Sequence, residues 1–376
     1  MAYRILLTGG GSGGHVFPLI AVANALKEKA QQNGQELELL ILGDGRFIEK
    51  AAIDSSIPFK RILTGKLRRY FSLLTIIDIF KIPIGFFQSL WHMFWFMPDV
   101  IFAKGGYASL APSIIGRSYF IPLFIHESDS IPGLANRILG KLAKTVFISF
   151  QSAEKYFKAG KTVLIGNPLR KELIGQNKEK AIEAFQLNPG NKTILVLGGS
   201  QGAQKINDII LQSLVLVVKK FQLIHQCGET QYNYIKNEAD KLIKEGEGKY
   251  ADDIKTNYRL FPFLEIEQLG LAYAAADILI SRSGGGSIFE IAAASKPVIL
   301  IPITDSSADH QLANAREFSR FGAVVLEEQN LTPHILINQI ESLLNEGNYA
   351  KISANIKTFA KIDAADKIAD TLITNN

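Results

Sequence analysis

Short apolar runs alternate with longer segments of helical periodicity along the 376 residues of the chain. The runs are rich in Ile, Leu and Val, and they span residues 5–7, 37–42, 100–102, 123–126, 146–149, 193–197, 222–225, 278–281, 298–301 and 323–326. Apolar strands that alternate with helices are typical of βαβ units and of parallel sheets covered on both faces. The pattern therefore predicts an α/β fold.

A weak internal repeat divides this pattern into two halves. Residues 5–10 (ILLTGG) return as residues 194–200 (ILVLGGS), and a helical pattern follows both copies. Each copy is expected to open its own doubly wound domain, with a glycine turn at the carboxyl end of the first strand. Because the pattern breaks at residues 166–168 (GNP), we assign residues 1–163 to an N-terminal domain and residues 164–346 to a C-terminal domain. Two such domains facing each other predict a ligand cleft.

Composition and charge narrow the class of protein. Hydrophobic residues at 47% and charged residues at 20% are typical of a folded globular protein and exclude a disordered one. The single cysteine, Cys227, excludes an internal disulfide framework, and no Cys/His cluster has the spacing of a zinc site. The N-terminus does not resemble a secretory signal, so we expect a cytoplasmic protein. A net charge of +5 is modest, and no nucleic-acid partner is expected.

The first apolar run leads into a glycine-rich turn, residues 8–15 (TGGGSGGH), and Pro18 suits the first turn of a helix behind it. Backbone N–H groups at such a turn bind anions. The glycines also satisfy G-x-G-x-x-G, a weak dinucleotide signal on its own. His15 adds a titratable imidazole, which makes it a candidate general base. Two alternatives stay open, namely a hydrogen bond to a backbone carbonyl and binding of an acceptor diphosphate together with Ser12, Gly13 and Gly14.

A second glycine turn, residues 283–287 (SGGGS), lies between an apolar run and a helical pattern. Its backbone and the helix dipole favour a diphosphate. Glu290 lies one turn into the helix, where a carboxylate accepts hydrogen bonds from vicinal hydroxyls or simply stabilises the helix N-terminus. Ser200, in the second copy of the repeat, is suited to cap a helix or to bind a phosphate.

A basic segment precedes an aromatic one. Between Pro58 and Asp78 no residue is acidic, and the aromatic-rich stretch that begins at Phe71 continues to Met97. Charged residues and a proline interrupt this stretch, so a peripheral contact with an anionic membrane surface fits better than a transmembrane helix. The alternative is a core helix, and we expect one face to pack and the other to meet the bilayer. The residues assigned to membrane contact are Lys66, Arg68, Arg69 and Phe71.

Further motifs accompany these turns. They are residues 105–109 (GGYAS), 126–129 (HESD) with 133–136 (GLAN), 197–203 (LGGSQGA), 281–290 (SRSGGGSIFE), and 309–311 (DHQ) with 314–315 (NA). In order and spacing the set resembles the MurG family, which transfers N-acetylglucosamine from UDP-N-acetylglucosamine to lipid I to make lipid II. The resemblance covers most of the chain.

The resemblance implies a GT-B glycosyltransferase fold, in which two Rossmann-like domains face a cleft and a final helix, here about 347–376, returns to the first domain. It implies an inverting transfer for peptidoglycan synthesis, with UDP-N-acetylglucosamine and lipid I as substrates, at the cytoplasmic face of the cell membrane. No Asp-x-Asp signature ends a predicted strand, so we expect a metal-independent enzyme that uses no cofactor.

The resemblance also assigns residues to the donor. These are Ser12, Gly13, Gly14, Asp129, Arg170, Ser200, Leu264, Gly285, Gly286, Ser287, Ile288, Phe289, Glu290 and Gln311. Within this set, Glu290 matches the glutamate that holds the ribose, Leu264 the backbone contact to uracil, and Gln311 the glutamine that binds the sugar. For Arg170, a solvated surface arginine is the alternative.

The acceptor side is assigned to Gly105, Tyr107 and Asn136, and Glu127 competes with His15 as the catalytic base. Asp129 departs from the family, which usually has asparagine there. An aspartate accepts a hydrogen bond from a sugar hydroxyl but does not donate one.

Other classes of function remain as alternatives. Another GT-B glycosyltransferase with a lipid acceptor would share these motifs. An NAD(P)-dependent oxidoreductase requires an acidic residue about 20 positions after the glycines, whereas Asp44 lies 30 positions after Gly14. A non-catalytic protein that binds sugar nucleotides would keep residues 283–290 but would have no need for the His15 turn together with the basic and aromatic segments.

Overall fold

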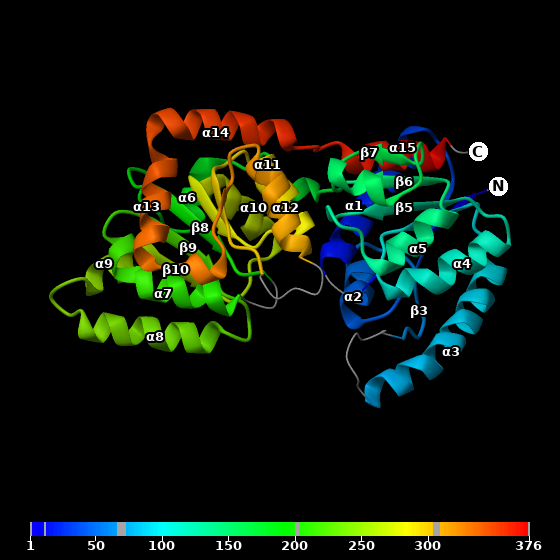
Figure 1. Ribbon diagram of the computed structural model, residues 1–376, viewed down its shortest axis with the longest axis horizontal. Helices are drawn as coiled ribbons and strands as arrows, with labels where there is room; N and C mark the ends of the chain where they lie inside the picture. Colours follow the sequence, from blue (N-terminus) through cyan, green and yellow to red (C-terminus); the bar gives the residue numbers. More distant parts are fainter. Residues whose placement is uncertain (1, 11–12, 66–72, 200–202, 304–308, 375–376) are drawn as a thin grey trace. The chain divides into compact units, whose positions relative to one another are not determined.

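The computed structural model describes residues 2–10, 13–65, 73–199, 203–303 and 309–374, without the side chains of residues 73–77 and 79. The chain divides into two compact units, each built on a parallel sheet (Figure 1). The first unit contains Met1–Arg170 and Lys361–Asn376, and the second contains Lys171–Ala360. The two units are described separately below.

The first unit holds a seven-stranded sheet in the order β3-β2-β1-β4-β5-β6-β7. Its strands are β1 (Tyr3–Thr8), β2 (Leu37–Gly43), β3 (Phe59–Arg61), β4 (Val100–Ala103), β5 (Leu123–Glu127), β6 (Thr145–Ile148) and β7 (Thr162–Leu164). Its helices are α1 (Gly13–Gln32), α2 (Arg46–Asp54), α3 (Leu73–Phe96), α4 (Leu110–Ser118), α5 (Leu134–Leu142) and α15 (Ala364–Ile373), with short 3₁₀ turns at Tyr107–Ser109 and Gln151–Tyr156. All pairings are parallel, and Thr8 of β1 lies between Leu42 and Ala103.

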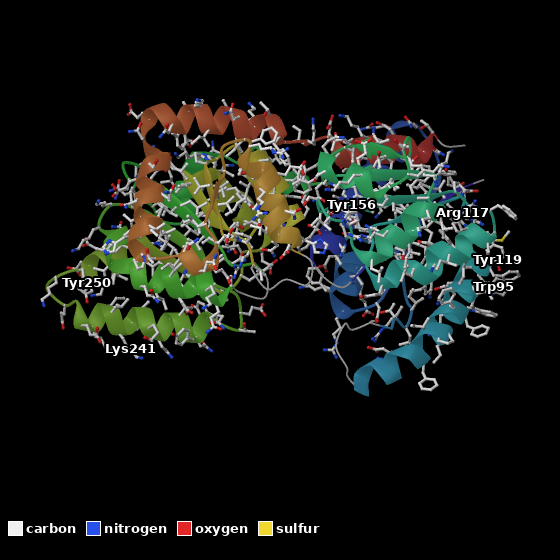
Figure 2. All side chains as sticks on the ribbon, in the orientation of Figure 1. Trp95, Arg117, Tyr119, Tyr156, Lys241 and Tyr250 are labelled. Carbon is white, nitrogen blue, oxygen red and sulfur yellow. The ribbon has the colours of Figure 1, made fainter. Side chains whose placement is uncertain are left out.

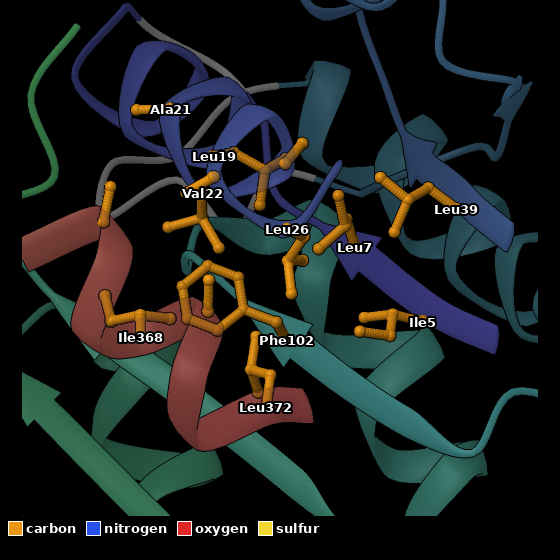
Figure 3. Packing of buried hydrophobic residues seen from close by; sticks show 14 of the residues in the cluster. Ile5, Leu7, Leu19, Ala21, Val22, Leu26, Leu39, Phe102, Ile368 and Leu372 are labelled. Atoms are coloured by element: carbon orange, nitrogen blue, oxygen red, sulfur yellow. The ribbon is translucent and has the colours of Figure 1, made fainter. Parts of the chain in front are cut away.

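The core of the first unit lies between the sheet, α1 and α15 (Figure 3). Leu7 of β1 and Phe102 of β4 pack with Leu26 of α1 and with Leu372 of α15, and all four are fully buried. The hydroxyl of Tyr3 donates to the carbonyl of Leu372 at 3.0 Å. The end of the chain therefore completes the hydrophobic core around the first strand.

The second unit holds a six-stranded parallel sheet in the order β10-β9-β8-β11-β12-β13. Its strands are β8 (Thr193–Leu197), β9 (Gln222–Gln226), β10 (Tyr258–Phe261), β11 (Ile278–Ser281), β12 (Val298–Leu300) and β13 (Val324–Val325). Its helices are α6 (Lys178–Ala184), α7 (Gln204–Val218), α8 (Tyr232–Glu245), α9 (Ala251–Asn257), α10 (Ile266–Ala275), α11 (Gly285–Ala294), α12 (His310–Ser319), α13 (Pro333–Leu344) and α14 (Glu346–Phe359), with 3₁₀ turns at Lys171–Leu173 and Glu328–Asn330.

Two sequence expectations differ in detail from these elements. The returning segment is shorter than residues 347–376, because α14 stays with the second unit, where Phe359 packs on Phe289 of α11 with ring centroids 4.8 Å apart. Pro18 is not in the first turn of its helix, since α1 begins at Gly13 and Pro18 lies inside it. The chain passes between the units at Arg170 and again at Lys361.

Candidate active site

In the first unit, the turns that carry the sequence motifs follow β1, β4 and β5, at the point where the strand order reverses between β1 and β4. Ligands of doubly wound sheets bind at this point, beyond the carboxyl ends of the strands. Gly106 has a φ of 82°, and a Cβ there would lie 2.8 Å from the carbonyl oxygen of Gly10. Only glycine therefore allows the turn after β4 to lie against the turn after β1.

His15 lies in the first turn of α1 and is half-buried. Its Nδ1 is 3.3 Å from the carbonyl oxygen of Lys104. A neutral ring that donates from Nδ1 keeps Nε2 as an acceptor. Burial and the charge of the Lys104 ammonium lower the pKa of His15 to about 4, against the opposing charge of Asp129. The imidazole is therefore neutral near pH 7, which is the protonation state that a general base requires.

Glu127 ends β5 and organises the loop behind it. One carboxylate oxygen accepts from the backbone N–H of Asp129 at 2.9 Å. The other accepts from the side-chain amide of Asn136 at 2.9 Å and from the N–H of Gly133 at 3.2 Å. Burial and the charge of Asp129 raise the pKa of Glu127 to about 7, while the hydrogen bonds from Asp129 and Asn136 and the charge of Lys104 oppose that rise. Both oxygens are occupied, so this carboxylate is better placed to hold the loop than to receive a substrate proton.

Lys104 is a residue of this site that the sequence analysis missed. It directly follows β4, its side chain has no solvent exposure, and its ammonium donates to the hydroxyl of Ser128. Burial lowers the pKa of Lys104 to about 8, while the charges of Glu127 and Asp129 act to raise it. The only sequence signal is the position of this lysine, between a fully apolar strand and a pair of glycines.

The residues assigned to the acceptor lie around the same strand ends. Tyr107 begins the 3₁₀ turn behind Gly105, and the buried amide of Asn136 donates to the carbonyl of His126 at 3.1 Å as well as to Glu127. A Cβ on Gly105 would lie 2.8 Å from the amide nitrogen of Asn136. Asn136 therefore connects the end of β5 to the glycine turn that follows β4.

The residues assigned to the donor fall into two groups. Gly13, Gly14, Asp129 and Arg170 belong to the first unit, whereas Leu264, residues 285–290 and Gln311 belong to the second. The guanidinium of Arg170 stacks on the ring of Phe17 in α1, 3.9 Å from the ring centroid. Arg170 is therefore held beside the first glycine turn and is not a fully solvated surface residue. Ser12 and Ser200 lie outside the described residues.

In the second unit, α11 begins directly behind β11, and its N-cap residue, Gly284, has no side chain with which to cap the helix. The first N–H groups of a helix have no partner within it, so Gly285, Gly286 and Ser287 offer donors to an anion. The side chains of Ile288 and Phe289 are buried, so they face the core, and any ligand contact from these two residues must come from the backbone.

Polar side chains surround this N-terminus. Glu290 is half-buried, and one of its carboxylate oxygens accepts from the hydroxyl of Tyr273 at 3.2 Å. The backbone carbonyl of Gln311, in the first turn of α12, accepts from Ser283 at 2.8 Å, while its side-chain oxygen accepts from the N–H of Ile303 at 3.2 Å. These hydrogen bonds connect the start of α12 to the segments that follow β11 and β12. Among the described residues, the side-chain N–H groups of Gln311 make no hydrogen bond, so they remain available to a ligand.

Leu264 is buried, and its N–H donates to the side-chain oxygen of Gln226 at 3.0 Å. Its backbone carbonyl is therefore the group available to a nucleotide base.

Asp44 directly follows β2, the place where a dinucleotide-binding enzyme needs an acidic residue, but its carboxylate oxygens accept hydrogen bonds from Thr64 at 2.7 Å and Arg61 at 3.2 Å. Within the described parts of the chain, no group of three or more His, Cys, Asp or Glu side chains is arranged to hold a metal ion.

One face of α3, which we call the aromatic face, carries large apolar side chains exposed to solvent. It consists of Phe80, Ile84, Phe87, Trp91, Phe94 and Trp95. Their spacing follows the helical period, whereas Gly85, Ser89 and Met93 on the opposite side are buried. No helix in the described ranges is both long and apolar enough to span a membrane. The residues Lys66, Arg68, Arg69 and Phe71 lie outside those ranges.

A basic pocket of about 450 Å³ lies near the end of α4. Arg117, which is labelled in Figure 2, comes from the last turn of α4, and this helix packs against α3. Its lining includes four basic residues and no acidic one, namely Arg117, Lys141, Lys144 and Lys161. Phe120 at its rim is 86% exposed. Among the described residues of the first unit, this basic pocket and the aromatic face are surface features suited to contact with a membrane.

Comparison with known proteins agrees with this architecture. The chain matches the glycosyltransferase family 28 N-terminal domain over residues 5–148 and the glycosyltransferase family 28 C-terminal domain over residues 193–368. A Clostridium botulinum protein named UDP-N-acetylglucosamine–N-acetylmuramyl-(pentapeptide) pyrophosphoryl-undecaprenol N-acetylglucosamine transferase is 37% identical over 365 residues, which are 96% of either chain. A Treponema denticola protein of the same name is 34% identical, over 96% of this chain and 93% of the other.

Solved structures show the same likeness. The crystal structure of Acinetobacter baumannii MurG is similar with a TM-score of 0.75 and 25% identity, over 99% of both chains. The UDP-GlcNAc 2-epimerase from Neisseria meningitidis, solved with UDP-GlcNAc bound, has a TM-score of 0.68 at 18% identity, over 99% of this chain and 100% of the other. The second likeness shows a shared fold alone.

Proposed function

The chain belongs to glycosyltransferase family 28, and we propose that it transfers N-acetylglucosamine from UDP-N-acetylglucosamine to the muramoyl sugar of lipid I, with inversion, giving lipid II for peptidoglycan synthesis. The observation that carries this proposal is the identity of 34–37% over nearly the whole length to relatives that bear this transferase name. The two glycine-turn sites supply the chemistry that the reaction needs.

His15 is the proposed general base. The acceptor hydroxyl must lose its proton as the anomeric carbon gains oxocarbenium character. The Nε2 of a neutral His15 takes that proton, because its Nδ1 faces the Lys104 carbonyl. Glu127 holds the adjoining loop through its hydrogen bonds to Asp129 and Asn136.

The N-terminus of α11 is the proposed site of the donor's diphosphate. Its uncapped N–H groups and helix dipole stabilise the negative charge that grows on the departing UDP. Glu290 accepts hydrogen bonds from the ribose hydroxyls, and the amide of Gln311 binds the transferred sugar. The carbonyl of Leu264 accepts from the uracil.

The direct test is transfer of radiolabelled N-acetylglucosamine from UDP-N-acetylglucosamine to a short-chain lipid I analogue. We expect a disaccharide-linked lipid and release of UDP. A lipid acceptor that lacks the muramoyl sugar serves as the control. Transfer to that control but not to the analogue would indicate a different lipid glycosyltransferase, and binding of NADH in place of the UDP-sugar would contradict the proposal.

A peripheral contact with the cytoplasmic face of the cell membrane is also proposed, because the acceptor is lipid-linked. The aromatic face and the basic pocket support it, since aromatic side chains favour the bilayer interface and basic side chains attract anionic headgroups. Large apolar side chains on the outer side of a helix also have no role in packing the core.

Vesicle co-sedimentation tests this contact. Reversal of charge at Arg117 and Lys141 should weaken binding to anionic vesicles by about 2 kcal/mol per residue at low salt, because each reversal removes an attraction of about 1 kcal/mol and adds a similar repulsion. The same reversal at Lys241 and Lys244, two exposed lysines on α8 of the second unit, is the matched control. Equal loss from both pairs would indicate a general effect of net charge and would contradict docking through the basic pocket.

A further inference from the structure

Lys104 connects three separate segments of the first unit's site. Its backbone N–H donates to the carbonyl of Thr8 in β1 at 2.8 Å, and its own carbonyl faces Nδ1 of His15. Its ammonium donates to Ser128 behind β5, whose hydroxyl donates to Asn167 at 3.0 Å. Since the side chain is wholly buried, its charge must be balanced inside the protein.

Two carboxylates and two histidine rings face this ammonium. Glu127 at the end of β5 and Asp129 in the loop behind it both favour the charged form of Lys104. His15 on α1 and His126 on β5 also face it, and the ammonium disfavours a proton on either ring. Glu127 is buried, and both its burial and the charge of Asp129 disfavour its ionised form, whereas the Lys104 ammonium favours it.

We propose that Lys104 is a positioning residue of the transfer reaction: its buried ammonium helps Glu127 to ionise beside Asp129, and this keeps the loop behind β5 in place beside His15. The inference rests on the proposed function, because it concerns the same reaction. An ionised Glu127 accepts the hydrogen bonds from Asp129, Gly133 and Asn136, whereas a protonated one accepts them more weakly.

The consequence is a defined dependence on pH. In the parent enzyme, the acid limb of the kcat/KM profile should report the ionisation of Glu127. Without the Lys104 ammonium, the pKa of Glu127 should rise, so this carboxylate stays protonated up to a higher pH. Without the charge of Asp129, the pKa of Glu127 should fall, because a neighbouring negative charge is removed.

The experiment compares three variants with the parent in the transfer assay between pH 5.5 and 9. These are Lys104→Met, which keeps an unbranched chain without charge, Asp129→Asn, and the two combined. We expect Lys104→Met to shift the acid limb up by about one pH unit, which is about a fivefold loss at pH 7, because about half of Glu127 is ionised there in the parent, and a recovery at high pH. Asp129→Asn should shift it down, and the double variant should return it toward the parent.

The outcomes separate charge balance from packing. If Lys104→Met loses activity equally at every pH and the double variant does not move the limb back, Lys104 only fills space and the proposal is overturned. Should Lys104→Met fail to fold, Asp129→Asn still decides, because an unmoved acid limb in that variant contradicts the proposal. Failure of the proposed function appears differently, as a parent enzyme that transfers no sugar to the lipid I analogue.

Discussion

Each unit places a histidine beside its first glycine turn, but the two rings are used differently. His225 of β9 is bonded at both nitrogens, with Nε2 at 3.0 Å from the side-chain oxygen of Asn207 and Nδ1 at 2.9 Å from the hydroxyl of Tyr258. Among the described residues, the His15 ring makes one hydrogen bond, between Nδ1 and the carbonyl oxygen of Lys104. A ring with both nitrogens occupied holds a structure together, whereas a ring with one acceptor left can exchange a proton with a substrate.

The surroundings of the two turns differ in the same sense. Charged groups buried around the first turn, Lys104 and Glu127, act on one another and on His15. Around the start of α11, by contrast, the donors are backbone N–H groups, and Glu290 is only half-buried. We infer that the first unit carries the proton chemistry and that the second unit binds the nucleotide.

The largest expected effect is that of His15→Ala. Removal of a general base lowers turnover by about 10²–10⁴-fold, and donor affinity should change little because the nucleotide is held in the second unit. Steady-state kinetics and calorimetry with UDP measure the two quantities. His334→Ala, at an exposed position in α13, is the control. A collapse of donor affinity with normal turnover of bound substrate would place His15 in the nucleotide site.

Glu290→Ala should have the next largest effect. Loss of charge-assisted hydrogen bonds to the ribose costs about 1.5–3 kcal/mol, or roughly a 10- to 150-fold weaker Kd for UDP. Glu346→Ala, at an exposed position that begins α14, is the matched control. Unchanged calorimetric affinity in a folded Glu290→Ala variant would remove Glu290 from the ribose site.

His225 should have the smallest effect, on stability alone. Burial lowers its pKa from 6.5 to about 3 in the folded protein. Below pH 6.5 this histidine binds a proton in the unfolded chain but not in the folded protein. The free energy of unfolding therefore decreases as the pH is lowered from about 6.5 to about 3, by up to about 1.4 kcal/mol per pH unit.

The variant His225→Gln tests whether His225 causes this pH dependence of stability. Thermal unfolding should show that the variant is less stable than the parent at pH 7 but loses less stability as the pH is lowered to 5. The same pH dependence in parent and variant would show that His225 does not produce it.

The sequence predicted the central strands of both sheets better than their edges. The ten apolar runs all form strands, because central strands of parallel sheets are buried on both faces. The strands β3, β7 and β10 were missed. They lie at sheet edges, where partial exposure permits polar residues such as Lys60 in β3 and Arg259 in β10 and so hides the apolar signal.

Within the site, motif positions were predictable, whereas side-chain directions were not. Glycine turns mark the ends of β1 and β11, since a tight turn after a strand leaves its signature in consecutive residues. The burial of Lys104 depends on Ser128, Glu127 and Asp129, which belong to another strand and its loop. The contact of Arg170 with Phe17 likewise joins residues far apart in the chain. No local pattern records such contacts.

The first unit is proposed to carry the proton chemistry and the second to bind the nucleotide. This division is tested most directly in the variants His15→Ala and Glu290→Ala. For each variant, one measures the single-turnover rate of transfer at saturating donor and the equilibrium Kd for UDP. We expect His15→Ala to lower the rate and leave the Kd near that of the parent, and Glu290→Ala to raise the Kd and leave much of the saturated rate. If both variants change the rate and the Kd together, the assignment of proton chemistry to the first unit and nucleotide binding to the second is contradicted.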